Sequence, residues 1–150
     1  MGTHYKGTKD EVRALNAYIK LMRGAESVTS RLNTLAAAGG LTLSQFGALE
    51  ALFHLGPLCQ RELGEKLLKS SGNITMIVDN LEKRRLVKRR RGGEDRRFVT
   101  VHLSDQGRRL ITSIFPRHVS AIVKELNSLT KREQEELGRL CRKVGRKERR

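Results

Sequence analysis

The segment SSGNITMIVDNLEKRRLVKRRRGGEDRRFVTVHL, from Ser70 to Leu103, changes from one periodicity to another. Its first part has apolar residues at three- and four-residue spacing, which predicts a helix with one buried face and with Ser70 as its cap. Its last part alternates Val99, Val101 and Leu103 with other residues, which predicts a strand. Cations and a Gly-Gly pair lie between the two parts. The segment therefore predicts a helix followed by a β-hairpin with a positively charged tip.

The helix face opposite the apolar stripe is polar and almost uncharged. It carries five residues, Ser71, Asn73, Thr75, Met76 and Asn80. Short polar side chains can approach base edges closely, while cations on a neighbouring hairpin can hold phosphates or enter a minor groove. The pattern favours sequence reading by the helix and affinity from the hairpin. An ordinary solvated helix face is the alternative interpretation.

Positive charge is concentrated in two short segments. The chain has 31 Lys and Arg residues and 16 acids, a formal net charge of +15. Residues 82–97 hold nine cations and three acids, and residues 142–150 hold six cations and one acid. A charge that serves only solubility would be spread more evenly, so we expect a polyanionic partner. The second segment is equally compatible with loose phosphate binding and with plain solvation.

The elements on either side of the opening segment are mostly helices. The first predicted helix covers about residues 9–38, and the second begins after a cap at Thr42 and stops at Gly56 and Pro57. A short third helix begins after a cap at Cys59. Two further helices are predicted near the C-terminus: one begins at Ser104 and bends near Pro116, and the other begins with a capping box at Thr130 and Glu133. The fold class is thus mainly α with a small β-hairpin, in a single domain of 150 residues. The long first helix needs a partner along its apolar stripe, from its own domain or from a second subunit.

The sequence offers little for other classes of function. His54, His102 and His118 lack the spacing of a metal site, and no catalytic constellation or cofactor motif is present, so we expect neither an enzyme nor a cofactor or metal. Cys59 and Cys141 stand far apart without a CxxC motif, which is typical of reduced thiols. The first twenty residues lack an apolar run, and no window reaches the length of a transmembrane helix. We therefore expect a cytoplasmic protein without a membrane partner.

The stretch ITMIVDNLEKRRLVKRRRGGEDRRFVTVHLSDQGRRL resembles the winged helix–turn–helix of the MarR (multiple antibiotic resistance regulator) family of transcription factors. VDNLE matches the end of the recognition helix, LVKR the entry to the wing, EDRR its tip and VHLSDQGR its exit. LTLSQFGALEAL and GPLCQRELGEKL match the two preceding helices. The likeness extends over essentially the whole chain.

This resemblance implies a winged helix–turn–helix fold with N- and C-terminal dimerisation helices. Residues 1–38 and 104–150 would form the dimerisation region of one MarR-like domain, and residues 41–103 its DNA-binding lobe. The implied function is sequence-specific binding of double-stranded DNA by a homodimer on a pseudo-palindromic operator. The simplest form is a repressor that a small-molecule effector releases. An architectural DNA-binding protein without sequence preference and a redox-responsive regulator that uses Cys59 are the alternatives.

Carried over by position, the resemblance implies DNA contacts from the recognition helix and the wing. These residues are Ser70, Ser71, Asn73, Thr75, Met76, Arg90, Arg91, Arg96 and Arg97. Asp95 would be a structural acid of the wing that orients neighbouring arginines. Met22, Phe46 and His54 are candidates for an effector site, with packing in the core as the alternative. Cys141 is expected to be a buried thiol of the dimer region.

Two positions depart from the family pattern. Arg85 stands at the end of the recognition helix, where similar sequences often have Gly, so it has to adopt a left-handed conformation that disfavours side chains. Met76 stands where Arg is common, which should lower phosphate affinity and alter base preference.

Overall fold

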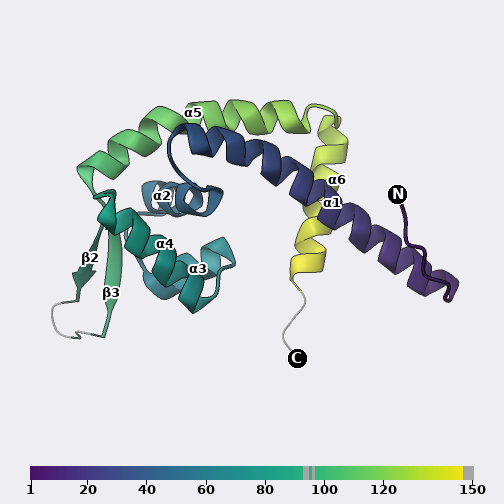
Figure 1. Ribbon diagram of the computed structural model, residues 1–150, viewed down its shortest axis with the longest axis horizontal. Coiled ribbons are helices and arrows are strands. Elements are labelled where there is room, and N and C mark those ends of the chain that lie inside the picture. Colours follow the sequence, from purple (N-terminus) through teal and green to yellow (C-terminus); the bar gives the residue numbers. More distant parts are fainter. Residues whose placement is uncertain (93–94, 96, 147–150) are drawn as a thin grey trace. The chain divides into compact units, whose positions relative to one another are not determined.

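Helices dominate the computed structural model (Figure 1), which describes residues 1–92, 95 and 97–146. The elements are α1 (Lys9–Ala38), α2 (Leu43–Leu55), β1 (Leu58–Cys59), α3 (Gln60–Leu67), α4 (Ser71–Lys83), β2 (Val87–Arg91), β3 (Val99–Leu103), α5 (Asp105–Leu126) and α6 (Lys131–Gly145). This order confirms the mainly helical class with a small β wing. It also places the hairpin directly after the helix that carries the polar face.

The sheet has one strand more than the sequence indicated. Its order is β1-β3-β2, and both pairs are antiparallel. In the two-residue strand β1, Leu58 pairs with Val101 and Cys59 with Thr100. Two residues are too few to show an alternating pattern, so the sequence predicted only a helix cap there. This short pairing joins the wing to the start of α3.

Residues 1–118 and 119–150 form two compact units, and α5 belongs to both. The core of the first unit unites α2, α3, α4, the wing strands and the start of α5. Its most deeply buried side chains are Leu49, Leu52, Leu63, Ile74, Val78, Leu81, Val87, Val101 and Ile111. Burying one such side chain stabilises the fold by about 1.5–3 kcal/mol. This core holds α4 by one face and leaves the opposite face in solvent.

Long apolar faces in both units have no cover within the described chain. On α1, Ala36 alone is buried, and Tyr18, Leu21, Met22 and Leu35 are exposed. On α6 no described residue is buried, although Leu137, Leu140 and Val144 follow one another at helical spacing. Cys141 is exposed on this helix. Amphipathic helices of this kind are stabilised chiefly when their apolar face is packed, so these faces call for a further partner.

Among the residues that the structure describes, two other than glycine have left-handed backbone conformations, one on each side of α4. Arg85, with φ of 59°, follows α4 as the sequence predicted. Leu68, with φ of 53°, is the C-cap of α3, and its left-handed conformation was not predicted. Both conformations favour Gly because a Cβ atom comes too close to the following carbonyl oxygen. The turns before and after α4 are therefore strained.

Candidate nucleic-acid interface

Helix α4 presents the polar face that the sequence predicted. Its apolar stripe of Ile74, Ile77, Val78 and Leu81 is buried, whereas Ser71, Asn73, Thr75 and Met76 are exposed. Ser70 caps the helix: its hydroxyl oxygen accepts a hydrogen bond from the backbone N–H of Asn73 at 3.3 Å. Since the Asn73 amide group is exposed, it offers both donor and acceptor atoms to a groove. A helix held in this way can enter a major groove with its polar side leading.

A shallow cavity of about 310 Å³ runs along one side of this polar face. It is lined by Thr42, Ser44, Gln45, Lys69, Asn73, Met76, Ile77 and Asn80. Ser44 and Gln45 come from the first turn of α2, Thr42 is the N-cap of that helix, and Lys69 lies in the turn before α4. Lys69 is the one charged side chain in this lining. Asn73 and Met76 thus face a mostly neutral hollow rather than a cluster of charge.

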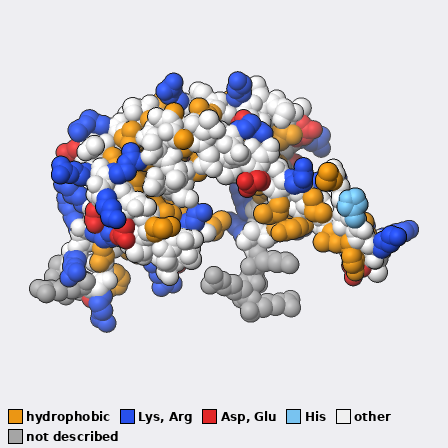
Figure 2. Space-filling model, in the orientation of Figure 1, with side chains coloured by type: hydrophobic (Ala, Val, Ile, Leu, Met, Phe, Trp, Pro, Cys, Tyr) orange, Lys and Arg blue, Asp and Glu red, His pale blue; other side chains and the backbone are white. Residues whose placement is uncertain are grey.

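The wing carries most of the local positive charge. In the paired strands, Val87 and Val101 are buried, whereas Lys88, Arg90 and Arg91 are exposed. Figure 2 shows Lys and Arg side chains gathered over the part of the molecule that contains β2 and β3. Burial, and then the charge of Arg90, lower the pKa of His102 on the neighbouring strand. The charge of the wing therefore comes from its Lys and Arg residues rather than from imidazolium.

At the tip, Asp95 and Arg97 form a local pair. The Asp95 carboxylate accepts hydrogen bonds from the backbone N–H of Arg97 at 3.0 Å and from its Nε at 3.1 Å. The Arg97 side chain is nevertheless 91% exposed, so the pair adds little stability but restricts where the guanidinium points. Phe98, also exposed, closes the turn with its backbone N–H on the Asp95 carbonyl at 3.1 Å. Arg96, an implied contact, lies outside the described residues.

Arg89 differs from the other cations of the wing. Its guanidinium bonds to Asp79 at 2.6 Å and to Glu82 at 3.1 Å, and its backbone N–H donates to Glu82 at 3.0 Å. Its side chain is 22% exposed. The inward position of Arg89 could have been predicted from the sequence. Side chains alternate between the two faces of a strand, and Arg89 falls on the same face as the buried Val87. This arginine locks the wing to α4 instead of extending into solvent.

The three candidate effector residues do not line one cavity. Phe46 is buried and packs against His118, with the two rings tilted by 39° and their centroids 4.1 Å apart. His54 is exposed, with its Nδ1 3.0 Å from the Glu50 carbonyl oxygen, and Met22 lines a groove of α1 alone. A cavity of about 120 Å³ does lie beside Phe46, lined also by Leu35, Ala36, Ala38, Gly39, Ile114, Arg117 and His118.

Burial lowers the pKa of His118, and the negative charge of Glu50 opposes this shift. His118 is half-buried, and its ring lies against the Phe46 ring. An imidazole in such a place is more stable neutral than charged. Arg117 is therefore the permanent cation in the lining of the small cavity.

The other features bring no chemistry together. Cys59 caps α3: its thiol accepts from the Glu62 N–H at 3.5 Å, and its own N–H donates to the Glu62 carboxylate at 2.8 Å, which lowers the pKa of Glu62.

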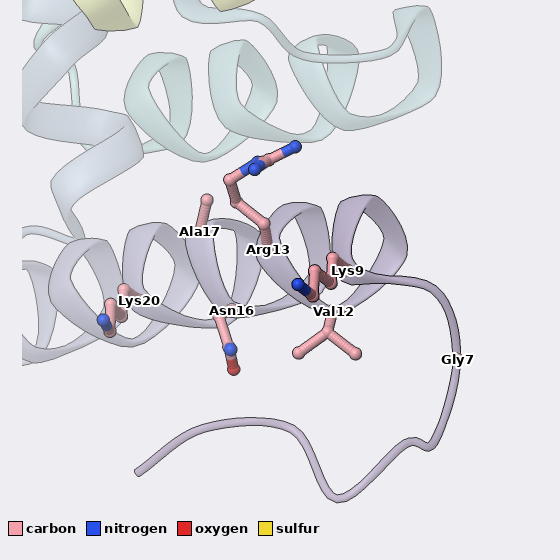
Figure 3. A pocket seen from close by; sticks show the side chains of 7 residues that line it. All are labelled: Gly7, Lys9, Val12, Arg13, Asn16, Ala17 and Lys20. Atoms are coloured by element: carbon pink, nitrogen blue, oxygen red, sulfur yellow. The ribbon is translucent and has the colours of Figure 1, made fainter.

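An open groove of about 660 Å³ lies between α1 and its own N-terminal segment, where Val12 and Asn16 point toward that segment (Figure 3). Within residues 1–92, 95 and 97–146, no three His, Cys, Asp or Glu side chains group as a metal site, and no helix could span a membrane.

A solvent-facing polar helix beside a cationic hairpin defines a winged helix–turn–helix of the DNA-binding class. The family model described as MarR family matches residues 39–97. Over 133 residues, the chain is 32% identical to the HTH-type transcriptional regulator MhqR of Bacillus subtilis (strain 168). This match covers 89% of this chain and 92% of that protein. The chain belongs to the MarR family of DNA-binding transcriptional regulators.

Solved structures agree in fold. The MarR family regulator Sco3205 of Streptomyces coelicolor, solved in complex with DNA, matches with a TM-score of 0.84 at 22% identity, over 96% of this chain and 91% of that one. The DNA binding of BpsR of Bordetella bronchiseptica is regulated by 6-hydroxynicotinic acid. Its structure matches with a TM-score of 0.79 at 22% identity, and the match covers 86% of this chain and 98% of that one. At these identities the match establishes a shared architecture.

Proposed function

We propose that this chain is a homodimeric, cytoplasmic, sequence-specific regulator, most simply a repressor, that binds a pseudo-palindromic operator. The observation that carries the proposal is the division between the uncharged exposed face of α4 and the cationic wing beside it. Phosphate contacts supply affinity without sequence information, and base contacts supply the information. A purely architectural DNA-binding protein would have no use for a recognition face kept free of charge.

The uncovered apolar faces support the proposed dimer. In this proposal, residues 1–38 and 104–150 pack against their copies in a second subunit, and residues 41–103 form the DNA-binding lobe. A two-fold axis brings the same surface of both chains together and presents two copies of α4. Two recognition helices one helical turn of DNA apart match a palindromic site. Cys141, exposed on the single chain, becomes buried in this interface.

The proposed contacts divide between two kinds of readout. Ser71, Asn73, Thr75 and Met76 face the bases. Ser70, Arg90, Arg91, Arg96 and Arg97 hold phosphates or enter the minor groove. Asp95 orients the arginines of the tip, which its hydrogen bonds to Arg97 support. Arg89 is left out of the contact set because two carboxylates already hold its guanidinium.

Two substitutions test this division after half-sites have been selected from random duplexes at stated salt. We expect Asn73→Ala to relax the preference at one position of each half-site, by about 1–3 kcal/mol of discrimination. Arg97→Ala should weaken binding to all duplexes. It should also reduce the slope of the logarithm of the binding constant against the logarithm of the salt concentration by about 1, the value of one phosphate contact. Arg61→Ala, which removes an exposed arginine paired with Glu65 on α3, serves as the control. Equal losses on selected and random DNA for both test variants would support the architectural alternative.

A second function, response to an effector, is favoured by the small cavity beside Phe46. Its lining, apolar side chains with Arg117 as a cation, matches the chemistry of a small aromatic acid. BpsR sets the precedent of regulation by such a molecule. An effector acts only if it binds the DNA-incompetent state better than the competent one. Titrating 6-hydroxynicotinic acid into the protein–DNA complex tests this, with Arg117→Gln as the variant that should lose the response.

A further inference from the structure

A chain of hydrogen bonds connects the wing to the exposed face of α4 through Gln60. Arg89 Nη2 donates to Gln60 Oε1 at 3.3 Å. Gln60 Nε2 donates to Thr75 Oγ1 at 2.7 Å, and Thr75 Oγ1 donates to the Ser71 carbonyl oxygen at 2.9 Å. Gln60 is the first residue of α3 and is half-buried. Three elements thus meet at one amide group.

The direction of every bond in this chain follows from its first member. A guanidinium has donors and no acceptor, so the oxygen of the Gln60 amide has to face Arg89. The amide nitrogen then faces Thr75 and can only donate. The Thr75 oxygen accepts that bond, which leaves its own proton for the Ser71 carbonyl. Since Asp79 and Glu82 hold Arg89 in place, a reversed Gln60 amide would bring its NH₂ group against a guanidinium N–H, two donors without an acceptor.

This arrangement changes what Thr75 offers to DNA. Its hydroxyl proton and one of its two lone pairs are occupied within the protein. The exposed side chain therefore presents its methyl group, with no hydrogen-bond donor to spare. Guanine shows two acceptors, N7 and O6, in the major groove, and neither can be satisfied by such a group. The methyl group of thymine, by contrast, makes favourable apolar contact with a threonine methyl.

On this basis we propose that Gln60 is a specificity-determining positioning residue: it holds the Thr75 hydroxyl inward, so that the methyl group of Thr75 reads the DNA. The inference rests on the proposed function, because it assumes that α4 lies in a major groove. Without Gln60, the bond to the Ser71 carbonyl alone holds the hydroxyl, so the hydroxyl turns outward more readily and donates to purine N7 or guanine O6. The preference at that base pair then becomes broader.

The test first selects duplexes from a random pool with the wild-type protein. The affinity of each variant is then measured on duplexes that carry each of the four base pairs at each half-site position. Thr75→Val keeps the methyl group and loses the hydroxyl, so we expect its preference to stay within about twofold of wild type. Thr75→Ser keeps the hydroxyl and loses the methyl group, and it should lower discrimination at one position by about fourfold, the value of one buried methyl group. Gln60→Met, which keeps the length of the side chain, should relax the same position.

The decisive measurement combines two of these changes. Gln60→Met should alter the preference in the wild-type background and leave it unchanged in the Thr75→Val background, since the latter has no hydroxyl to release. A structural role or a phosphate contact of Gln60 would lower affinity in both backgrounds and on all duplexes alike. Arg89→Lys, which keeps a charge between the two acids but loses the planar fork, should act like Gln60→Met more weakly.

Two results would overturn the inference while the proposed function stands. One is a uniform loss of affinity for Gln60→Met in both backgrounds. The other is a loss of preference for Thr75→Val as large as that for Thr75→Ser. If the wild-type protein selects no motif from the pool, the proposed function fails, and this inference fails with it. Thermal unfolding of each variant shows that the compared proteins are folded.

Discussion

Leu68 should be more stable as glycine. Its backbone is left-handed, with φ of 53° and ψ of 40°, and its side chain is 92% exposed, so glycine loses almost no packing. The left-handed conformation costs an L-residue about 1–2 kcal/mol. Glycine avoids that cost but loses about 0.5–1 kcal/mol more conformational entropy on folding. The difference predicts that Leu68→Gly raises the free energy of unfolding by about 0.5–1 kcal/mol.

Thermal unfolding at one fixed protein concentration measures this gain. For a chain of 150 residues, an unfolding entropy of about 2.1 cal/mol/K per residue converts 1 kcal/mol into about 3 °C. We therefore expect Tm to rise by about 2–3 °C. The concentration has to be fixed because the stability of a dimer depends on it.

The matched control is Leu68→Ala, which removes the same exposed side chain but keeps the Cβ atom. Its stability should stay within about 0.5 kcal/mol of wild type, as for other surface substitutions. If Leu68→Gly is no more stable than Leu68→Ala, the strain is absent and the reasoning is refuted. Arg85→Gly, at the other end of α4, should gain a similar amount, because φ there is 59°.

Two other changes should lower stability. A Cβ on Gly107 would overlap the Leu86 carbonyl oxygen, so Gly107→Ala should lower the free energy of unfolding in urea by about 3 kcal/mol. Gly72→Ala on α4, where the added Cβ meets nothing within 4 Å, should leave it unchanged or raise it by up to about 1 kcal/mol. Equal losses for the two variants would contradict the close approach at Gly107. Because burial lowers the pKa of His118, the folded state prefers neutral imidazole, and the free energy of unfolding should fall as pH drops below the ordinary value of 6.5. His118→Gln should reduce this pH dependence in urea titrations at pH 7.5 and 5, and an unchanged slope would count against it.

The helix ends were the most predictable part of the fold. Capping boxes at Thr42, Cys59 and Thr130 are local in sequence, with a cap oxygen or sulfur and an acid or amide three residues on. Their bonds depend on no distant residue, so the pattern alone is enough. The buried stripe of α4 was equally clear, because its four apolar residues follow the period of a helix.

Features that depend on distant partners were missed. Strand β1 exists because Leu58 and Cys59 meet β3, about forty residues further along the chain. The left-handed Leu68 was missed for a different reason: leucine has no preference for that conformation, and only the tight turn between α3 and α4 imposes it. The exposed polar face and the cationic wing were anticipated from the sequence, but the bonds between them were not. Nothing near Gln60 in the sequence indicates that its amide reaches Thr75.

The run of cations from Lys88 to Arg91 illustrates why charge counts overstate contact with DNA. Successive residues of a strand point to opposite faces, so a basic run cannot direct all its charges outward. Here Arg89, on the face of the buried Val87, is neutralised by Asp79 and Glu82 and fixes the wing to α4. The salt dependence of binding counts phosphates actually neutralised, not cations in the sequence. Because Arg89 fixes the wing to α4, the positions of the other wing arginines are better defined, but Arg89 itself is lost as a phosphate contact.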